Sequence, residues 1–347
     1  MEFVVPARLK AGDRIAVVSP SNALGGVLPL PYELGVRRLR QDFGLDVVEY
    51  PTTLKMGSSP EARAADVMAA FADPDIRAII ASIGGSDQIR VVPHLDPDVV
   101  RANPKPFFGS SDNTNLLAWL WSLGIVSYHG STVMVQFGRP GAMHPLVVES
   151  FRAAAFDGGE YALSPVPAYG DRQRDWRDPG TFDREPEMFA CDGWVWRGDT
   201  SRLVNGIAWG GCVEVLAWLL MADRTVPAND EIRGGVFFFE TSEELPPAEE
   251  VYRILRSMGE RGLLGSFGAI LAGRPKAERV HSPRTEAERR AYASAQMEAV
   301  DRAVSEYAPD AVLVHNVDLG HTDPQFVIPM GGPIAVDGPG RRIVVTY

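Results

Sequence analysis

Three short segments, far apart in the sequence, carry side chains that together could perform nucleophilic catalysis. They are FFGSSDNTN around Ser111, GGVFFFE ending at Glu240, and DLGHTDP around His321. A hydroxyl, a carboxylate and an imidazole are the groups that turn a neutral serine into an attacking group near neutral pH. We therefore predict that Ser111 is the nucleophile, His321 the general base and Glu240 the carboxylate that orients the imidazole.

The segment around Ser111 is typical of a tight turn between a strand and a helix. Two aromatic residues and Gly109 precede the serine, and such a turn can project a hydroxyl above a sheet. The G-x-S-x-G pattern is not matched, because Asn113 stands where its second glycine would be. Ser110 is expected inside the turn. One alternative stays open from this segment alone, in which Ser111 and Asp112 only cap the helix.

The assignments of Glu240 and His321 support each other. Glu240 ends a very apolar strand, where a carboxylate is costly to bury without a hydrogen-bonded partner, and an imidazole would supply one. The alternative is a solvated acidic turn that Glu240 forms with Glu243 and Glu244. His321 lies in a Gly-His-Thr-Asp-Pro turn with little side-chain bulk, although a lone loop histidine is usually a surface residue.

Gly84 and Gly85 follow the apolar run IIASI and offer a backbone that can approach a ligand closely. We predict that Gly84 contacts substrate and that the N–H groups of Gly85 and Asp112 form an oxyanion hole. A glycine pair after a strand is also a common turn or phosphate signal. The patterns G-x-x-x-x-G-K-[ST], G-x-G-x-x-G and H-E-x-x-H do not occur, so we expect neither a metal nor a cofactor.

Strands alternate with helices along the chain, which predicts an α/β fold with a parallel sheet of Rossmann or flavodoxin type in the first half. The expected strands are 14–19, 76–82, 107–108, 235–240 and 269–272, and the expected helices are 60–72, 113–123, 213–221 and 247–258. Ligand-contacting groups should gather at the carboxyl ends of such strands.

The alternation stops between about residues 165 and 196, where Pro, Asp, Arg and Trp are frequent. We predict an N-terminal α/β domain over 1–165 that carries the nucleophile. A linker or active-site loop over 166–196 follows, and then a C-terminal domain over 197–347 that carries the glutamate and the histidine.

Bulk composition argues against several partners. A formal net charge of -11 is unfavourable for a nucleic-acid polymer, because such binding rests on clustered Lys and Arg. No run approaches the roughly 20 apolar residues of a membrane span, and the N-terminus does not look like a signal peptide. We expect a cytoplasmic protein with no membrane partner. Cys191 and Cys212 are the only cysteines, and we expect both to be free thiols.

The chain resembles the LD-carboxypeptidase family of serine peptidases and, within it, the microcin C immunity peptidases. The resemblance implies a parallel-sheet N-terminal domain, a smaller C-terminal domain of β-barrel type, an active site between them and a homodimer. It implies the roles given above for Ser111, Glu240 and His321 and for the amides of Gly85 and Asp112. The matching stretches are AGDRIAVVSPS, ASIGGSDQIRVVPHLD, FFGSSDNTNLL, WGGCVEVL, FFFETSEELPPAEEVYRIL, AGRPKAE and LGHTDPQFVIPMGG.

Two departures from the family pattern bear on the substrate. Members that trim cell-wall tetrapeptides typically have Arg-Gly-Gly-Tyr-Gly where this chain has IGGSD at 83–87, and Gly-Gly-Asn-Leu where it has GGCV at 210–213. Both favour the immunity branch, in which the substrate resembles a small peptidyl- or aminoacyl-nucleotide. The resemblance thus implies a serine carboxypeptidase or amidase that hydrolyses an amide-type bond.

Two other functions stay open at this point. One is LD-carboxypeptidase activity on murein tetrapeptides, and the other is non-catalytic binding of a nucleotide-like ligand. Trp194 and Trp196 lie next to the expected loop and could stack on a base. They could equally serve only to anchor the loop to the second domain.

Overall fold

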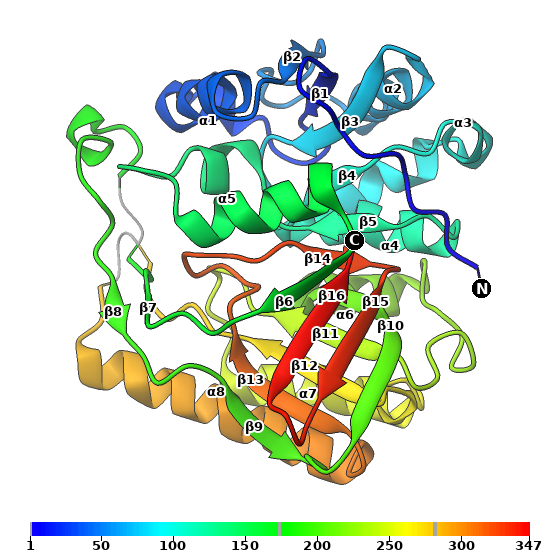
Figure 1. Cartoon of the computed structure of the whole chain (residues 1–347), viewed down its shortest axis with the longest axis vertical. Helices are drawn as coiled ribbons and strands as arrows, with labels where there is room; N and C mark the ends of the chain where they lie inside the picture. The colour runs from blue at the N-terminus through cyan, green and yellow to red at the C-terminus, as the bar shows by residue number, and fades with distance from the viewer. Residues whose placement is uncertain (1, 173–174, 280–282) are drawn as a thin grey trace.

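Short apolar strands form a six-stranded sheet within the described residues (Figure 1). The computed structural model describes residues 2–172, 175–279 and 283–347. The strands of this sheet are β1 (Arg14–Val18), β2 (Asp46–Glu49), β3 (Ile76–Ala81), β4 (Phe107–Gly109), β5 (Ser127–His129) and β14 (Ile328–Met330). Their order is β14-β5-β4-β3-β1-β2, in which β1 to β5 are parallel and β14 is antiparallel to β5.

The order β2-β1-β3-β4-β5 is the doubly wound order of flavodoxin-like folds, in which strand addition reverses direction between β1 and β3. Both of these strands are buried along nearly their whole length, as expected for parallel strands covered on both faces. Ligand sites in such sheets lie beyond the carboxyl ends of the strands at the reversal point. Residues 19–22 after β1 and 82–85 after β3 occupy that place.

Helices pack around the first sheet. The helix that begins at Pro60 starts where its capping residues predict. The Ser59 side chain accepts a hydrogen bond from the Ala62 N–H, and Pro60 occupies the first turn. The helices are α1 (Pro29–Gln41), α2 (Pro60–Ala72), α3 (Pro97–Ala102), α4 (Thr114–Ser122) and α5 (Pro145–Arg152). Short 3-10 or π segments are η1 (Leu24–Gly26), η2 (Gln88–Arg90), η3 (Val92–His94), η4 (Ser111–Asn113), η5 (Val133–Phe137) and η6 (Ala153–Asp157).

The later part of the chain forms an eight-stranded mixed sheet within the described residues. Its strands are β6 (Glu160–Leu163), β9 (Val195–Gly198), β10 (Leu203–Cys212), β11 (Val236–Glu240), β12 (Ala269–Gly273), β13 (Val312–Val317), β15 (Pro333–Asp337) and β16 (Arg342–Thr346). Their order is β6-β16-β15-β10-β11-β12-β13-β9, and the run from β10 to β13 is parallel. The other pairings are antiparallel.

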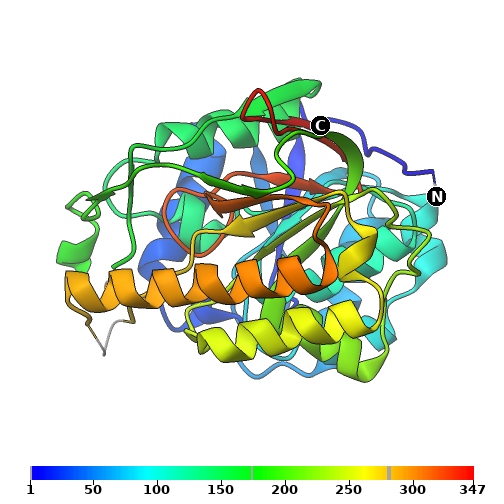
Figure 2. The same ribbon diagram turned by 90° about the horizontal axis from the view of Figure 1, so that it is seen from below.

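Helices α6 (Val213–Ala222), α7 (Ala248–Glu260) and α8 (Glu286–Tyr307) belong to this second part, together with η8 (Leu264–Ser266). Figure 2 shows α7 and α8 lying side by side below the strands. The sheet ends at β6 and β9, which are not paired with each other in the described residues. The resemblance implied a barrel-type domain, whereas the pairing found is that of an open mixed sheet.

The two parts of the chain exchange strands. β14 comes from the last part of the chain but pairs with β5 of the first sheet, with Ile328 opposite His129. β6 precedes residue 165 but pairs with β16 of the second sheet. The predicted boundaries at 165 and 196 therefore remain predictions. The segment between them holds η7 (Pro179–Thr181) and the short pair β7 (Ala168–Tyr169) and β8 (Phe189–Ala190).

The predicted α/β class, with a parallel-strand sheet in the first half and a separate sheet in the second, is confirmed. The strands expected over 14–19, 76–82 and 235–240 each differ by one residue from the observed strand. The helix expected from residue 113 begins at Thr114, because the tighter turn η4 precedes it. The 22-residue helix α8 was not expected from the hydrophobic pattern.

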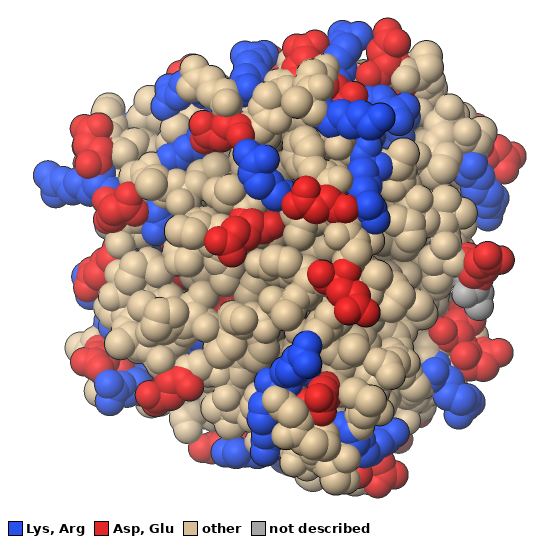
Figure 3. Space-filling view, in the orientation of Figure 1, with Lys and Arg blue, Asp and Glu red and all other residues tan. Residues whose placement is uncertain are grey.

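Acidic and basic side chains are interspersed on the face shown in Figure 3. Helix α8 carries ion pairs one turn apart, Arg290 with Glu286 and Arg302 with Glu306. Exposed pairs of this kind add only about 0.3–0.5 kcal/mol each, so α8 depends mainly on its packing against α7. None of the helices in the described part of the chain is long and apolar enough to cross a membrane.

The Tyr347 hydroxyl lies 3.3 Å from Ser150 Oγ of α5 and so links the two parts of the chain, which gives a stability prediction. The buried Tyr347 hydroxyl donates to the Val327 carbonyl at 2.6 Å. Tyr347→Phe should lower the free energy of unfolding by about 1–3 kcal/mol, because a buried carbonyl loses its donor. Tyr307→Phe is the matched control, since that hydroxyl bonds Glu260 at an exposed site. Urea denaturation measures both, and equal losses would contradict the prediction.

Candidate active site

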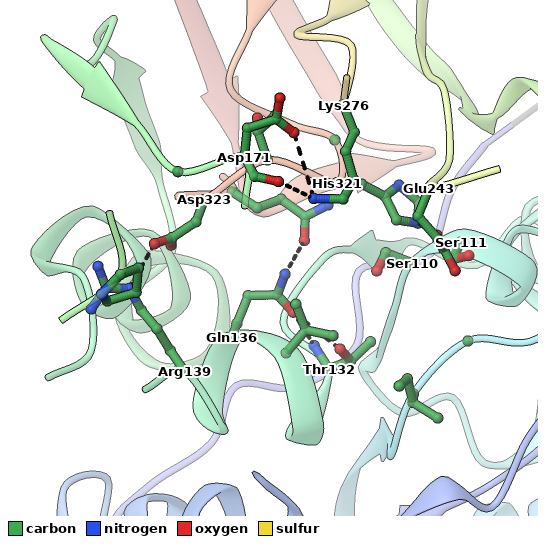
Figure 4. A pocket seen from close by; sticks show the side chains of 18 of the residues that line it. Ser110, Ser111, Thr132, Gln136, Arg139, Asp171, Glu243, Lys276, His321 and Asp323 are labelled. Carbon is green, nitrogen blue, oxygen red and sulfur yellow. Dashed lines mark hydrogen bonds and ion pairs between the residues drawn. The ribbon is translucent and has the colours of Figure 1, made fainter. Parts of the chain in front are cut away.

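One cavity collects the predicted catalytic segments from both halves of the chain. Its volume is about 280 Å³, close to the lower end, about 300 Å³, of the usual range for small-molecule sites. Figure 4 shows Ser110 and Ser111 on the same side of it as His321 and Glu243, while Arg139 lies on the other side. Further lining residues are Gly84, Gly85, Gln136, Asp171, Lys276 and Asp323.

Ser111 stands at the turn between β4 and α4. Its φ of +60° lies in the left-handed region, which residues other than glycine rarely adopt. Strained strand-to-helix turns of this kind hold a nucleophile above the sheet in serine hydrolases. The side chain is half-buried and lines the cavity, and it makes no capping hydrogen bond in the described residues.

The residue after Ser111 anchors the turn. The buried carboxylate of Asp112 accepts hydrogen bonds from the Ser21 hydroxyl, from the Gln88 N–H at 2.9 Å and from the Asn115 amide at 2.9 Å. Burial raises the pKa of the Asp112 carboxyl, and the hydrogen bonds from Ser21 and Gln88 oppose that rise. The side chain therefore ties the serine turn to the loops that follow β1 and β3.

The two amides predicted to form the oxyanion hole lie in loops that approach each other closely. A Cβ atom at Gly84 would lie 2.8 Å from the Ser111 Cβ and 3.4 Å from the Asp112 nitrogen. In the described loops neither the Gly85 nor the Asp112 N–H donates to a backbone acceptor. Gly85 lines the cavity, whereas Asp112 is buried beside it, and the catalytic role of both N–H groups remains a prediction.

Glu240 and His321 form a direct pair. Glu240 ends β11 with only 1% of its surface exposed, and its Oε2 lies 2.5 Å from Nδ1 of His321. A Cβ atom at Gly320 would lie 2.8 Å from the Cβ of Glu240. The glycine of the GHTDP turn therefore permits this close approach. Because Glu240 is buried, the alternative in which it belongs to a solvated acidic turn is excluded.

The other imidazole nitrogen faces a second carboxylate. Nε2 of His321 lies 3.1 Å from Oε2 of Glu243, and no hydrogen bond joins it to Ser111 in the described residues. Burial lowers the pKa of His321, but the charges of Glu240 and Glu243 and the hydrogen bond to Glu240 outweigh it and raise the pKa well above its ordinary value. The imidazole can therefore act as a base only once Nε2 is released.

The second sheet is pressed against the helix that follows Ser111. Gly211 has a φ of +136°, and a Cβ atom there would lie 2.5 Å from the Thr114 side chain. The Cys212 N–H donates to Thr114 Oγ1 at 3.0 Å, and the Cys212 thiol donates to Glu214 at 3.3 Å. Glu214 in turn accepts from the Ser242 hydroxyl at 2.7 Å. The segment WGGCVEVL thus joins the two halves of the site.

Two buried cations of the cavity wall are held by acidic partners. Nζ of Lys276 donates to the Asp171 carbonyl at 2.6 Å and lies 3.5 Å from its carboxylate. Arg139 pairs with Asp323 at 2.7 Å (Figure 4) and with Glu185 at 2.7 Å. These pairs neutralise most of the positive charge that the side chains bring to the wall.

The tryptophans predicted to stack on a base do not line this cavity. The Trp194 indole N–H donates to the buried Asp318 at 3.0 Å, so this side chain anchors its segment to the second half. Trp196 lies on β9, which pairs with β13, and the Arg341 guanidinium lies over its ring. Trp176, within the segment predicted as a loop, does line the cavity.

Sequence reasoning assigned no role to several residues that the structure brings to the site. Gln88 and Lys276 lie within the stretches ASIGGSDQIRVVPHLD and AGRPKAE, which carry the family resemblance. Glu243 appeared only as part of an acidic turn. Arg139 and Trp176 carried no signal in the sequence, because their neighbours in space lie far away along the chain.

Two family models match the chain. The model of the LD-carboxypeptidase N-terminal domain matches residues 15–130, and that of the C-terminal domain matches residues 205–336. Together they cover more than half of the sequence, so the chain belongs to the LD-carboxypeptidase family, peptidase family S66. The fold and the family together define a serine peptidase, of LD-carboxypeptidase or microcin-immunity type.

Individual relatives cover most of the chain. The microcin C7 self-immunity protein MccF of Escherichia coli is 24% identical over 289 residues, which are 79% of this chain and 75% of that protein. A Bacillus subtilis protein named "Probable murein peptide carboxypeptidase" is 24% identical over 351 residues, 98% of this chain and 93% of the relative. A solved structure of MccF with aspartyl sulfamoyl adenosine has a TM-score of 0.83 at 24% identity, and the match covers 99% and 98% of the two chains. This last likeness shows the fold.

The close approach at Gly84 gives a prediction for activity. Gly84→Ala should lower kcat/KM by about 10- to 100-fold, because the new methyl group would lie 3.0 Å from the Ser111 hydroxyl oxygen and displace it. Gly180→Ala is the control, since its Cβ would meet only the flexible Asp178 side chain at 3.3 Å. Initial rates and melting temperatures measure both. Equal rates for the two variants would contradict the prediction.

Proposed function

We propose that this protein is a serine carboxypeptidase or amidase that hydrolyses an amide-type bond through Ser111, His321 and Glu240. The observation that carries the proposal is the buried 2.5 Å contact between Glu240 and His321, at the edge of the cavity that Ser111 also lines. A buried carboxylate that bonds one imidazole nitrogen fixes the tautomer and stabilises the imidazolium formed during acylation. The left-handed backbone at Ser111 supports the same assignment.

The reaction proceeds in two halves. Ser111 Oγ attacks the substrate carbonyl carbon while its proton passes to Nε2 of His321, and the oxyanion accepts hydrogen bonds from the Gly85 and Asp112 amides. The carbon–nitrogen bond then breaks, and His321 gives the proton to the leaving nitrogen. A water molecule next attacks the acyl group, gives one proton to His321 and releases the carboxylic acid. Ser111 recovers its proton from the imidazole.

The substrate we propose is a small peptidyl- or aminoacyl-nucleotide. A relative of this fold binds aspartyl sulfamoyl adenosine, in which an acyl group is joined to a nucleoside through a sulfamoyl nitrogen. Trp176 supplies an aromatic side chain in the cavity, as stacking on a base requires. A murein tetrapeptide is the second candidate, favoured by the similarity to the Bacillus subtilis relative over 98% of this chain. A homodimer, implied by the family resemblance, and a cytoplasmic location, expected from the sequence, remain predictions.

The nucleophile can be tested without knowing the substrate. A serine-directed fluorophosphonate should label the protein, because Ser111 Oγ attacks phosphorus and displaces fluoride. Ser111→Ala should lose labelling and at least about 10³-fold in turnover while keeping its fold. Ser110→Ala, next to it in the same cavity, should keep both. An unlabelled wild-type protein that still bound nucleotide would favour the non-catalytic binder.

Alanine substitutions of Trp176 and Trp196 test which of the two tryptophans stacks on the base. Trp176→Ala should raise KM for an acyl-sulfamoyl adenosine by about 5- to 100-fold, because it removes an aromatic face from the cavity. Trp196→Ala should leave KM unchanged. Steady-state kinetics measure both, with release of D-alanine from a murein tetrapeptide as the parallel assay. Faster turnover of the tetrapeptide, with no effect of Trp176→Ala, would exclude the nucleotide substrate.

A further inference from the structure

The carboxylates of Glu240 and Glu243 both contact the imidazole of His321, and they differ in burial and in hydrogen bonding. Glu240 has a fully buried side chain and bonds Nδ1 of His321 at 2.5 Å. The Glu243 side chain as a whole is 47% exposed, but its Oε2 is buried where it lies 3.1 Å from Nε2, without the alignment of a hydrogen bond. The first contact is a buried hydrogen bond, whereas the second lacks hydrogen-bond geometry and is held by charge.

The backbone around Glu243 is fixed, so any movement belongs to its side chain. The Arg279 guanidinium donates to the Glu243 carbonyl at 2.8 Å, and the Ser242 N–H donates to Glu214 at 3.0 Å. Leu245 turns the loop with a φ of +54°. A side chain that can rotate from a fixed backbone is suited to moving between two partners.

Glu243 differs in charge pairing from the other acids of the cavity wall. Asp171 pairs with Lys276, and Asp323 pairs with Arg139. In the described residues the ion-pair partner of Glu243 is His321 itself. Within the described residues this carboxylate therefore has no Lys or Arg ion-pair partner, although the charge of Lys276 acts on it. A ligand in the cavity would find it next to the reacting centre.

We propose that Glu243 is a specificity-determining residue that binds a cationic group of the substrate close to the scissile carbonyl and leaves Nε2 of His321 when it does so. The assignment rests on the proposed function, since it supposes that His321 is the base for Ser111. The cation is an ammonium or guanidinium, supplied either by the free α-amino group of an aminoacyl substrate or by a basic side chain.

Charge balance explains why a cationic substrate is preferred. A neutral substrate would have to separate Glu243 from the imidazolium and leave a carboxylate near the cavity without a partner, which is costly. A cationic substrate replaces the imidazolium as that partner. The displaced Glu243 then no longer holds the imidazole in its protonated form, and Nε2 becomes free to accept the Ser111 proton. Recognition and activation thus share one side chain.

Four acyl-sulfamoyl adenosines test the assignment: alanyl, N-acetylalanyl, lysyl and N-acetyl-lysyl. The wild-type protein should prefer the compounds that carry a cation. The N-acetyl pair, in which the α-amino group is blocked, decides whether the α-amino group or the side chain supplies that cation. Glu243→Gln should lower kcat/KM by about 10- to 100-fold for the preferred cationic compound only. Glu244→Gln is the matched control, because its side chain is 80% exposed, pairs with Arg279 and does not line the cavity. Equal losses on all four compounds would overturn the assignment.

Release of the base has a separate readout, the pH dependence of fluorophosphonate labelling, which needs no substrate cation. The groups that face His321 are Glu240 from β11, Glu243 from the next loop and His129 from β5, and Lys276 faces Glu243. Removing one carboxylate favours the neutral imidazole, so Glu243→Gln should move the acid limb of labelling to lower pH than in the wild type and in Glu244→Gln.

The two proposals fail in different ways. If the wild-type protein is not labelled at any pH, the proposed nucleophile and base are wrong, and the role of Glu243 falls with them. If the wild type is labelled but Glu243→Gln has the same pH profile and the same substrate preference, only the assignment of Glu243 is overturned.

Discussion

The contact between the buried Glu240 carboxylate and His321 is the interaction on which the rest of this site depends. A carboxylate at the end of a strand whose other residues are apolar costs several kcal/mol to bury unless it is paired and hydrogen-bonded. His321 supplies that partner at 2.5 Å, and the glycine beside it removes the bulk that would keep the two apart. The apolar strand and the histidine turn therefore need each other, and their pairing fixes the imidazole beside the cavity.

Ser111, the proposed nucleophile, reaches the same cavity because the two halves of the chain are joined in several independent ways. β14 returns from the second half to complete the first sheet, directly after the segment that carries His321. The Cys212 N–H bonds the helix that follows Ser111. Relative sliding of the halves would break a sheet pairing and buried hydrogen bonds together, which makes the distance between Ser111 and His321 a property of the whole fold.

Local patterns in the sequence predicted the strands that position the site, because buried parallel strands are short, apolar and bounded by glycine or proline. They did not foretell α8, whose apolar positions are diluted by charged residues, although Thr285 and Glu288 form a capping box that marks its start. Ser111, Glu240 and His321 could be proposed because each lies in a distinctive local segment. For Trp194 and Trp196 the sequence left stacking on a base and anchoring of the loop both open, since the direction of a side chain follows from strand pairing that the local sequence does not contain.

Glu243 illustrates the same limit in electrostatic terms. In the sequence it is one of several acids in a turn, and an acid just before two prolines and a helix carries no signal of a function. Its meaning comes from the distance to Nε2 of His321, a residue 78 positions away, and from the pairing of the neighbouring cations with other acids. The mutual stabilisation lowers the pKa of Glu243 to about 2 against the opposing effect of burial. The carboxylate is thus charged while it faces the imidazole.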